Sequence, residues 1–261
     1  MKYENIILEK KDRIAEITLN RPETRNALNG NLLLDLKEAL EQIQKEDVGV
    51  VIITGAGESF CAGMDIKAIG GEEEEKVDAI SMMMEVLPLL ENMEQPVIAA
   101  VNGYCLTGGM ELSGCCDLII ASENAMFGDT HARLSAIPGG GNTQRLPRLV
   151  GIRKAKEMLF TCDLFPAEEA ERFGLVNKVV APDKLREAAR ELATKILSND
   201  QKSVGRVKRL VNQGERLDFE SALELERTEF FSLLPVLREG LAKRRAEAQK
   251  KTRELLHGSS D

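Results

Sequence analysis

Apolar residues recur along the chain with two different periods, which predict strands in some segments and helices in others. Residues 4–9 and 13–19 are rich in β-branched residues and enclose a charged KKDR turn, so they predict two strands. Within residues 31–44, apolar side chains recur at intervals of three and four, which is typical of an amphipathic helix. The chain therefore opens with a pair of strands followed by a helix.

Three later segments are continuous apolar runs. They span residues 48–55, 96–103 and 117–122, and such runs predict strands that are buried on both faces. A helix that opens with four glutamates is predicted for residues 72–94, and a last strand for residues 176–180. Strands that alternate with helices predict a parallel sheet with helical crossovers, and therefore an α/β fold.

The C-terminal part of the chain has a helical pattern almost throughout. From residue 183 to 256, charged residues lie on one side of the predicted helices and apolar residues on the other. The spacing predicts two terminal helices, around residues 223–234 and 237–251. We therefore expect a core domain over residues 1–195 and a C-terminal helical region over residues 196–261.

Composition and charge exclude several classes of protein. The 261 residues carry 35 basic and 43 acidic side chains, a formal net charge of −8, and this acidic balance argues against nucleic acid as a partner. No apolar run reaches the roughly 18–20 residues of a membrane span, and residues 1–20 lack a signal-peptide pattern. We therefore expect a cytoplasmic protein without membrane contact, or an organellar protein whose presequence has been removed.

The number and spacing of the cysteines and histidines argue against a disulfide framework and a zinc site. The chain has five cysteines, an odd number without C-x-x-C spacing, and two histidines, His131 and His257. GGGNTQ, at residues 139–144, has glutamine where a dinucleotide loop needs its last glycine, and neither a phosphate loop nor a nucleophilic serine motif is present. We therefore expect no metal and no nucleotide cofactor.

Two glycine loops carry the candidate chemistry, and each follows a predicted buried strand. One is FCAGMD at residues 60–65, and the other is LTGGMEL at residues 106–112. Small residues let a ligand approach the backbone, and N–H groups at a helix start can stabilise an anionic oxygen. Each loop alone is also compatible with an ordinary turn, and Glu111 with a surface residue in a first helical turn. The pair is more informative, because open α/β sheets bind ligands at the carboxyl ends of their strands.

The chain resembles the crotonase, or enoyl-CoA hydratase/isomerase, superfamily over roughly residues 5–255. The resemblance rests on five segments in order, RPETRNALN, FCAGMDIK, PVIAAVNGYCLTGGMELSGCCDLIIAS, AMFGDTHARLSAIPGGGNTQRLPRLVG and AEEAERFGLVNKVV. It implies a crotonase-like spiral of ββα units followed by a C-terminal helical region that covers the active site and supports trimerisation. The expected assembly is a homotrimer or a dimer of trimers.

The resemblance also implies an enzyme that binds acyl-CoA thioesters and stabilises a thioester enolate. By position, the oxyanion hole would be the backbone N–H groups of Ala62 and Gly108, and Glu111 would be a catalytic acid or base. The residues implied to bind the substrate and its coenzyme A are Arg25, Ala27, Ala62, Gly63, Met64, Asp65, Ile66 and Gly108. Coenzyme A would enter as part of the substrate, with no separate cofactor.

One position departs from the family pattern. Hydratases of this family carry a second catalytic glutamate three residues after the glycine of an F-G pair, and this chain has His131 there, in FGDTHARL. Histidine can act as an acid or base near neutral pH, so His131 is a candidate catalytic residue that assists Glu111. It is equally compatible with a brace that positions the acyl group or pairs with Asp129.

The resemblance therefore implies a lyase of fatty-acid metabolism that hydrates a trans-2-enoyl-CoA. Isomerisation is an alternative, because one carboxylate and an oxyanion hole suffice to move a double bond, and hydrolysis and decarboxylation are others. A further alternative is a scaffold that binds CoA esters, partner proteins or RNA without turnover. The presence of Glu111 and of both glycine loops argues against a loss of activity, and the acidic charge argues against RNA.

Overall fold

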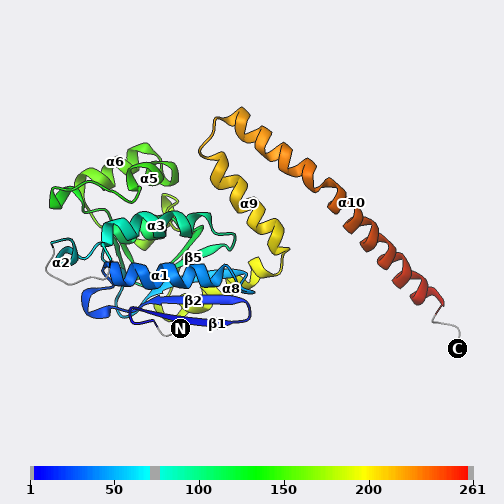
Figure 1. Cartoon of the computed structure of the whole chain (residues 1–261), viewed down its shortest axis with the longest axis horizontal. Coiled ribbons are helices and arrows are strands. Elements are labelled where there is room, and N and C mark those ends of the chain that lie inside the picture. Colours follow the sequence, from blue (N-terminus) through cyan, green and yellow to red (C-terminus); the bar gives the residue numbers. More distant parts are fainter. Residues whose placement is uncertain (1–2, 71–76, 258–261) are drawn as a thin grey trace. The chain divides into compact units, whose positions relative to one another are not determined.

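The computed structural model describes residues 3–70 and 77–257, and the chain divides into two compact units (Figure 1). The first unit ends at Lys208 and the second begins at Arg209. All of the described strands and both glycine loops belong to the first unit. The first residues of the helix predicted for 72–94 lie outside the described residues.

Six strands form the first sheet, and each matches a predicted strand. They are β1 (Ile6–Lys11), β2 (Ile14–Leu19), β3 (Val50–Gly55), β5 (Val97–Val101), β7 (Leu118–Ser122) and β10 (Lys178–Val180). Their order across the sheet is β1-β2-β3-β5-β7-β10. β1 and β2 pair antiparallel, as expected for strands joined by a short turn, and every other neighbouring pair is parallel.

A second sheet contains four short strands that the sequence pattern does not predict. They are β4 (Ser59–Cys61), β6 (Tyr104–Leu106), β8 (Met126–Gly128) and β9 (Phe165–Pro166), in this order across the sheet. None of these four is longer than three residues, so an alternation of apolar and polar positions cannot develop. Their pairing with one another supplies the structure that the local sequence does not specify.

Successive strands of the chain alternate between the two sheets. β3 joins the first sheet and β4 the second, and the pairs β5–β6 and β7–β8 repeat this step. The repeated strands are parallel within each sheet, so every turn of the chain advances by one strand. This arrangement confirms the predicted spiral of ββα units.

Helices of the first unit complete the spiral and cover its sheets. In chain order the helices of the described residues are α1 (Gly30–Ile43), α2 (Ile66–Ile69), α3 (Ala79–Asn92), α4 (Gly108–Gly114), α5 (Asn142–Val150), α6 (Ile152–Thr161), α7 (Ala167–Arg172), α8 (Leu185–Leu197), α9 (Gln201–Gly214) and α10 (Phe219–His257), of which α10 belongs to the second unit. α1 begins close to its predicted start because the Asn29 side chain accepts a hydrogen bond from the N–H of Leu32 and caps the helix. α1 and α3 pack side by side over the first sheet (Figure 1).

The central strands β3, β5 and β7 of the first sheet are buried on both faces, as their continuous apolar runs predict. In β3, Val51 belongs to an apolar cluster with α1 and α3, whereas Val50 packs with side chains of α8 on the opposite face. The first cluster also contains Phe60 and Phe127 of the second sheet, so both sheets share one core. Burial of each such side chain contributes about 1.5–3 kcal/mol relative to exposure, which makes this core a stable base for the loops.

The second unit consists mainly of α10. The prediction of two terminal helices is wrong, because the chain continues as one helix through Pro235. A proline inside a helix removes one hydrogen bond, and the strong helix formers on both sides sustain the helix across it. The predicted division after residue 195, and the roles predicted for the C-terminal region, stay predictions.

The described residues offer neither a membrane-spanning helix nor a cluster of metal ligands. Residues 3–70 and 77–257 include no helix that combines the length and the apolar composition needed to cross a bilayer. The same ranges hold no group of three His, Cys, Asp or Glu side chains suited to a metal ion. All five cysteines are free thiols.

Candidate active site

The two glycine loops lie side by side because the strands that precede them are neighbours. β4 and β6 pair in parallel, with Cys61 opposite Cys105, so their carboxyl ends reach the same edge of the sheet. The loop after β4 contains Gly63 and Met64, and α4 begins shortly after β6, at Gly108. A Cβ placed on Gly108 would lie 3.2 Å from the backbone nitrogen of Met64. The backbone of the first loop is therefore in contact with the start of this helix.

The N–H groups available at this contact are those of Met64 and Gly108, and the prediction of Ala62 as an oxyanion donor is wrong. The N–H of Ala62 donates to the carbonyl oxygen of Arg25 at 3.0 Å, so it is already occupied. Gly108 is the first residue of α4, where an N–H group has no partner within the helix. Within the described part of the chain, neither Met64 N–H nor Gly108 N–H has an acceptor. These two groups form the candidate oxyanion hole.

A parallel bridge between Leu28 and Met64 explains why the free donor belongs to Met64. The N–H of Leu28 donates to the carbonyl oxygen of Gly63 at 2.8 Å, and the N–H of Asp65 donates to that of Leu28 at 2.9 Å. Peptide groups of an extended chain alternate in direction, so the N–H of Met64 points away from Leu28. Gly63 has φ +110°, and a Cβ there would lie 3.1 Å from the Cβ of Thr107. In the sequence, the residue that supplies the donor N–H group is therefore recognised as the one that follows Gly63, the glycine with positive φ in this loop.

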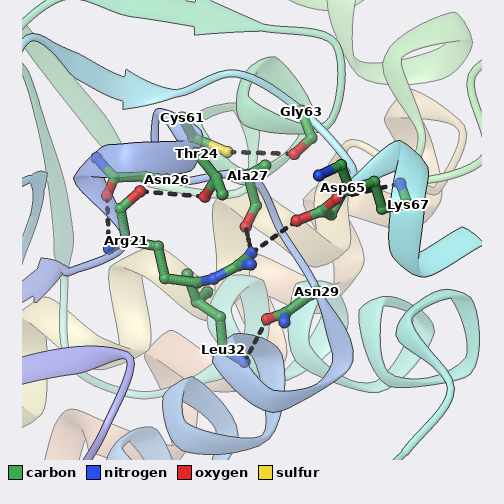
Figure 2. Close-up of polar contacts among 10 residues, drawn as sticks. All are labelled: Arg21, Thr24, Asn26, Ala27, Asn29, Leu32, Cys61, Gly63, Asp65 and Lys67. Atoms are coloured by element: carbon green, nitrogen blue, oxygen red, sulfur yellow. Dashed lines mark hydrogen bonds and ion pairs between the residues drawn. The ribbon is translucent and has the colours of Figure 1, made fainter. Parts of the chain in front are cut away.

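A buried ion pair holds the loop after β4 in place (Figure 2). Nη1 of Arg21 lies 2.9 Å from Oδ2 of Asp65 and donates to the carbonyl oxygen of Ala27 at 2.7 Å. The two charged residues are only 9% and 6% exposed. Oδ1 of Asp65 accepts a hydrogen bond from the N–H of Lys67 and caps α2. The Asp65 carboxylate therefore serves the structure of the loop.

We expect Arg21→Met to lower the free energy of unfolding by about 3–5 kcal/mol, because Asp65 would remain buried without its partner. Urea denaturation measures this change. Arg172→Met is the matched control, since the Arg172–Glu169 pair has side chains 74% and 42% exposed and should contribute less than about 1 kcal/mol. Equal effects of the two variants would contradict a structural role for the buried pair.

Arg25 and Ala27, which the family resemblance assigns to coenzyme A binding, lie in a loop that packs against residues 62–65. The guanidinium carbon of Arg25 lies 5.9 Å from the ring centroid of Tyr104. The side chains of Arg25 and Tyr104 are exposed, as is that of Ile66 at the start of α2. An exposed arginine beside an aromatic ring suits phosphate and purine groups. Contact of this loop with coenzyme A stays a prediction.

Glu111 is a buried carboxylate without a hydrogen-bond partner. It lies in the first turn of α4 and is 1% exposed, and neither carboxylate oxygen accepts a hydrogen bond from the described residues. Burial raises its pKa, against the charge of His131 and the nearby N–H groups of Gly140 and Asn142, which do not reach hydrogen-bond geometry. An unpaired buried carboxylate costs free energy. Its presence in the helix that begins at the free N–H group of Gly108 therefore points to a chemical role.

The backbone at Gly140 lies directly on this carboxylate. A Cβ at residue 140 would lie 2.8 Å from Oε2 of Glu111 and 2.7 Å from Cδ1 of Leu87 in α3. Arg145 fixes this segment, because its Nη1 donates to the carbonyl oxygen of Gly140 at 2.6 Å while Nε and Nη2 bind the carboxylate of Glu91. The sequence pattern tests the GGG run only as a dinucleotide loop and so misses its contact with Glu111.

Hydrogen bonds hold His131 near Glu111. Nδ1 of His131 lies 2.8 Å from Oδ1 of Asp129, and Oδ2 of Asp129 accepts a hydrogen bond from Nδ2 of Asn142 at 2.7 Å. Burial lowers the pKa of His131, but the hydrogen bond and charge of Asp129, together with the charge of Glu111, outweigh it and raise the pKa. The two predicted catalytic side chains are therefore close enough for their charges to interact.

The cysteines that flank this region have a packing role. Cys61 and Cys105 are fully buried in the apolar core. Burial raises the pKa of Cys61 to about 12 and raises that of Cys105 further. Such thiols are uncharged at neutral pH, so neither is a nucleophile.

Comparisons with known proteins show the family of this chain. A family model described as "Enoyl-CoA hydratase/isomerase" matches residues 9–249. The chain belongs to the enoyl-CoA hydratase/isomerase family. Both glycine loops and Glu111 lie within the matched residues.

Two relatives and one solved structure illustrate the similarity within the enoyl-CoA hydratase/isomerase family. A crotonyl-CoA hydratase from Syntrophomonas wolfei is 45% identical over 235 residues, which cover 88% of this chain and 90% of that protein. A short-chain-enoyl-CoA hydratase from Clostridium acetobutylicum is 44% identical over 88% of this chain and 89% of its own. The crystal structure of an enoyl-CoA hydratase from Bacillus anthracis has a TM-score of 0.86 at 41% identity, and the match covers 94% of this chain and 97% of that one.

Proposed function

We propose that this chain adds water to the double bond of a trans-2-enoyl-CoA thioester. The observation that carries the proposal is the buried, unpaired carboxylate of Glu111, in the first turn of a helix whose leading N–H group, on Gly108, is free. Relatives named crotonyl-CoA hydratase and short-chain-enoyl-CoA hydratase support it. The reaction makes the chain a hydro-lyase.

The proposed mechanism uses backbone donors for the anion and a carboxylate for the water. The thioester oxygen would accept hydrogen bonds from the N–H groups of Met64 and Gly108, because charge moves onto this oxygen when water attacks the β-carbon. In other enzymes, loss of one such donor costs about 2.7–4 kcal/mol of transition-state stabilisation. The raised pKa of Glu111 makes its carboxylate a better base for the proton that water releases.

Isomerisation is a second candidate function, and one observation favours it. His131 stands where hydratases of the family carry their second glutamate, and a single carboxylate can move a proton between two carbons of an enolate. A protein of this kind would convert a 3-enoyl-CoA to the conjugated 2-enoyl-CoA. The same oxyanion donors would serve both reactions.

The assay that tests the proposal follows the conjugated thioester absorbance of crotonyl-CoA. We expect the absorbance to fall as water adds and 3-hydroxyacyl-CoA to form, with the product identified by mass. If the absorbance of crotonyl-CoA stays constant but rises with a 3-enoyl-CoA, the chain is an isomerase. Tight binding of both esters without turnover would instead indicate a scaffold.

We expect Gly140→Ala to lower kcat with crotonyl-CoA by about 10²-fold, because a displacement of a catalytic group by about 1 Å has an effect of this size. The added methyl group would collide with Oε2 of Glu111 and with Leu87. Gly139→Ala is the matched control, since its Cβ would have Met84 as its nearest neighbour, at an ordinary 3.6 Å. An equal loss in both variants would show that the segment tolerates no side chain at all, and that contact with Glu111 is not the cause.

The assembly that we propose is a homotrimer or a dimer of trimers. Large apolar side chains exposed on α6, Ile152 at 61% and Phe160 at 74%, support a contact surface on the first unit. Light scattering should give a mass near three or six times the 28.8 kDa of one chain. A mass close to that of a single chain at micromolar concentration would contradict this assembly.

Two further proposals concern the surroundings of the reaction. Coenzyme A enters as part of the substrate, and the chemistry of two N–H donors, one carboxylate and one histidine requires no separate cofactor. A cytoplasmic location is supported by the five free cysteines, which suit a reducing compartment.

A further inference from the structure

We infer that Asp129 is a positioning residue that fixes one tautomer of His131 and thereby makes Nε2 of this histidine the proton donor of the reaction. The inference rests on the proposed hydration. It adds His131 as a second proton-transfer group, which Asp129 holds in position. It gives Asp129 and Asn142 a function that a reaction carried by Glu111 alone would not require.

The carboxylate of Asp129 is held from three sides. Its Oδ1 accepts a hydrogen bond from the backbone N–H of His131 at 3.1 Å and lies 2.8 Å from Nδ1 of the same residue, while Oδ2 accepts from Nδ2 of Asn142. Burial raises the pKa of Asp129, but the hydrogen bonds from His131 and Asn142 and the charge of His131 lower it below the usual range. An ionised carboxylate can only accept, so Nδ1 carries the hydrogen. Nε2 is then the nitrogen that is left for a substrate.

The loop that contains His131 is bonded to the helix that carries Glu111. Oγ1 of Thr130 lies 3.0 Å from Oγ1 of Thr107, and Thr107 directly precedes α4. Nε2 of His131 has no hydrogen-bond partner among the residues that the structure describes. The imidazole is therefore anchored on one side, while its second nitrogen stays free in the neighbourhood of Glu111.

A second connection runs through the segment that begins α5. Gly140 touches the Glu111 carboxylate, and two residues later Asn142 holds Asp129. Nδ2 of Asn142 also lies 3.4 Å from the carbonyl oxygen of Thr107. The same short segment thus supports the carboxylate and the positioning residue, so the two proton-transfer groups share one framework.

The proton balance of the proposed step uses both groups. Water forms a bond to the β-carbon and gives one proton to Glu111, while the electron pair of the double bond moves into the thioester as an enolate. The α-carbon of the enolate then forms a bond to the proton of Nε2, and the N–H bond breaks to leave a neutral imidazole. Transfer of the proton from Glu111 to His131, directly or through solvent, restores both groups. The net change is the addition of one water molecule.

Charged groups from three elements act on this pair. Asp129 precedes His131 in its loop, Glu111 faces it from α4, and Arg145 of α5 acts on Glu111. Glu111 must be ionised and His131 protonated, and both pKa values are raised above their ordinary range. We therefore expect kcat/KM to rise with pH as Glu111 loses its proton and to fall at higher pH as His131 loses its own.

Asp129→Asn tests the inference through this pH profile. Asparagine offers one accepting oxygen to three donors and removes the charge that favours protonated His131, so the alkaline limb should move by about 1 pH unit or more toward lower pH. We expect kcat to fall by about 10²-fold, with a change in KM below about threefold. Asp183→Asn, at an exposed position, is the matched control and should leave the profile unchanged.

Nitrogen-15 spectra of histidine side chains give a readout that does not depend on activity. The chain has two histidines, so His257→Gln assigns the signals of His131. We expect neutral His131 to carry its hydrogen on Nδ1 in the unmodified protein, and to titrate at lower pH in Asp129→Asn. If Asp129→Asn does not fold, His131→Gln replaces it, and its rate profile should lack the alkaline limb.

Two results would overturn the inference. One is an unchanged titration of His131 in the Asp129→Asn protein. The other is an alkaline limb that persists in His131→Gln. Failure of the unmodified protein to hydrate any enoyl-CoA would overturn the proposed function instead, while the nitrogen spectra would still decide whether Asp129 fixes His131.

Discussion

Glu111→Gln is expected to lower kcat with crotonyl-CoA by about 10²- to 10⁴-fold, the range that general acid–base groups contribute. Glutamine keeps the size and shape of the side chain, but its amide cannot take a proton from water. The free energy of unfolding should stay the same or rise at pH 7. We expect this because Glu111 is 1% exposed and its carboxylate oxygens have no hydrogen-bond partner. The substitution therefore removes an unpaired buried charge from the native state. Activity and stability are thus expected to change in opposite directions.

The pH dependence of stability gives the same expectation a second test. The pKa of Glu111 is raised in the folded chain, so ionisation of this group destabilises the native state once the pH exceeds the ordinary carboxylate value. The stability of Glu111→Gln relative to the unmodified protein should therefore increase from acid to neutral pH. Glu123→Gln, at an exposed position after β7, is the matched control for both measurements. Full activity of Glu111→Gln would refute the catalytic role of Glu111.

The sequence is sufficient to predict the centre of the first sheet because β3, β5 and β7 are continuous apolar runs. The run at residues 50–55 is buried on both faces by two different clusters, so every position in it is selected for apolar character. The strands of the second sheet are three residues long or shorter, and their pairing depends on neighbours far away in the chain. Local patterns therefore predict half of the spiral and leave the other half to tertiary contacts.

The candidate site, too, is predictable from local sequence in some parts and only from tertiary contacts in others. The spacing of FCAGMD and LTGGMEL locates both loops, and it places Glu111 where the structure has it. It does not identify the donor, because the choice between Ala62 and Met64 depends on the pairing of Leu28 with the loop. The support of His131 also lies partly outside its own motif, since Asn142, which donates to the Asp129 carboxylate, comes from α5. Hydrogen-bond partners that are distant in sequence leave no local signal, so only the structure could reveal them.

Gly109→Ala is expected to reduce both activity and stability, although residue 109 contacts no substrate atom in the proposed mechanism. A Cβ there would lie 2.3 Å from the carbonyl oxygen of Cys61 and 3.0 Å from its carbonyl carbon. Both are backbone atoms of β4, which cannot rotate away, so α4 would have to move off the strand. Overpacking of this kind costs about 1–3 kcal/mol in the free energy of unfolding. A shift of about 1 Å at the helix start would also lower kcat by about 10²-fold, because the N–H of Gly108 would leave its place beside Met64.

Gly114→Ala, at the other end of the same helix, separates this effect from a general intolerance of alanine. Apart from its chain neighbours and the backbone of its own helix, no atom of the described residues lies within 4 Å of the Cβ that it would add, so its kcat should equal that of the unmodified protein. Its stability should be equal or higher, since alanine favours a helix over glycine by up to about 1 kcal/mol. Urea denaturation and initial rates with crotonyl-CoA measure both variants. A folded Gly109→Ala protein with low kcat would show that the fit of α4 against β4 creates the anion site. Full activity in that protein would mean that the start of α4 does not hold the thioester oxygen.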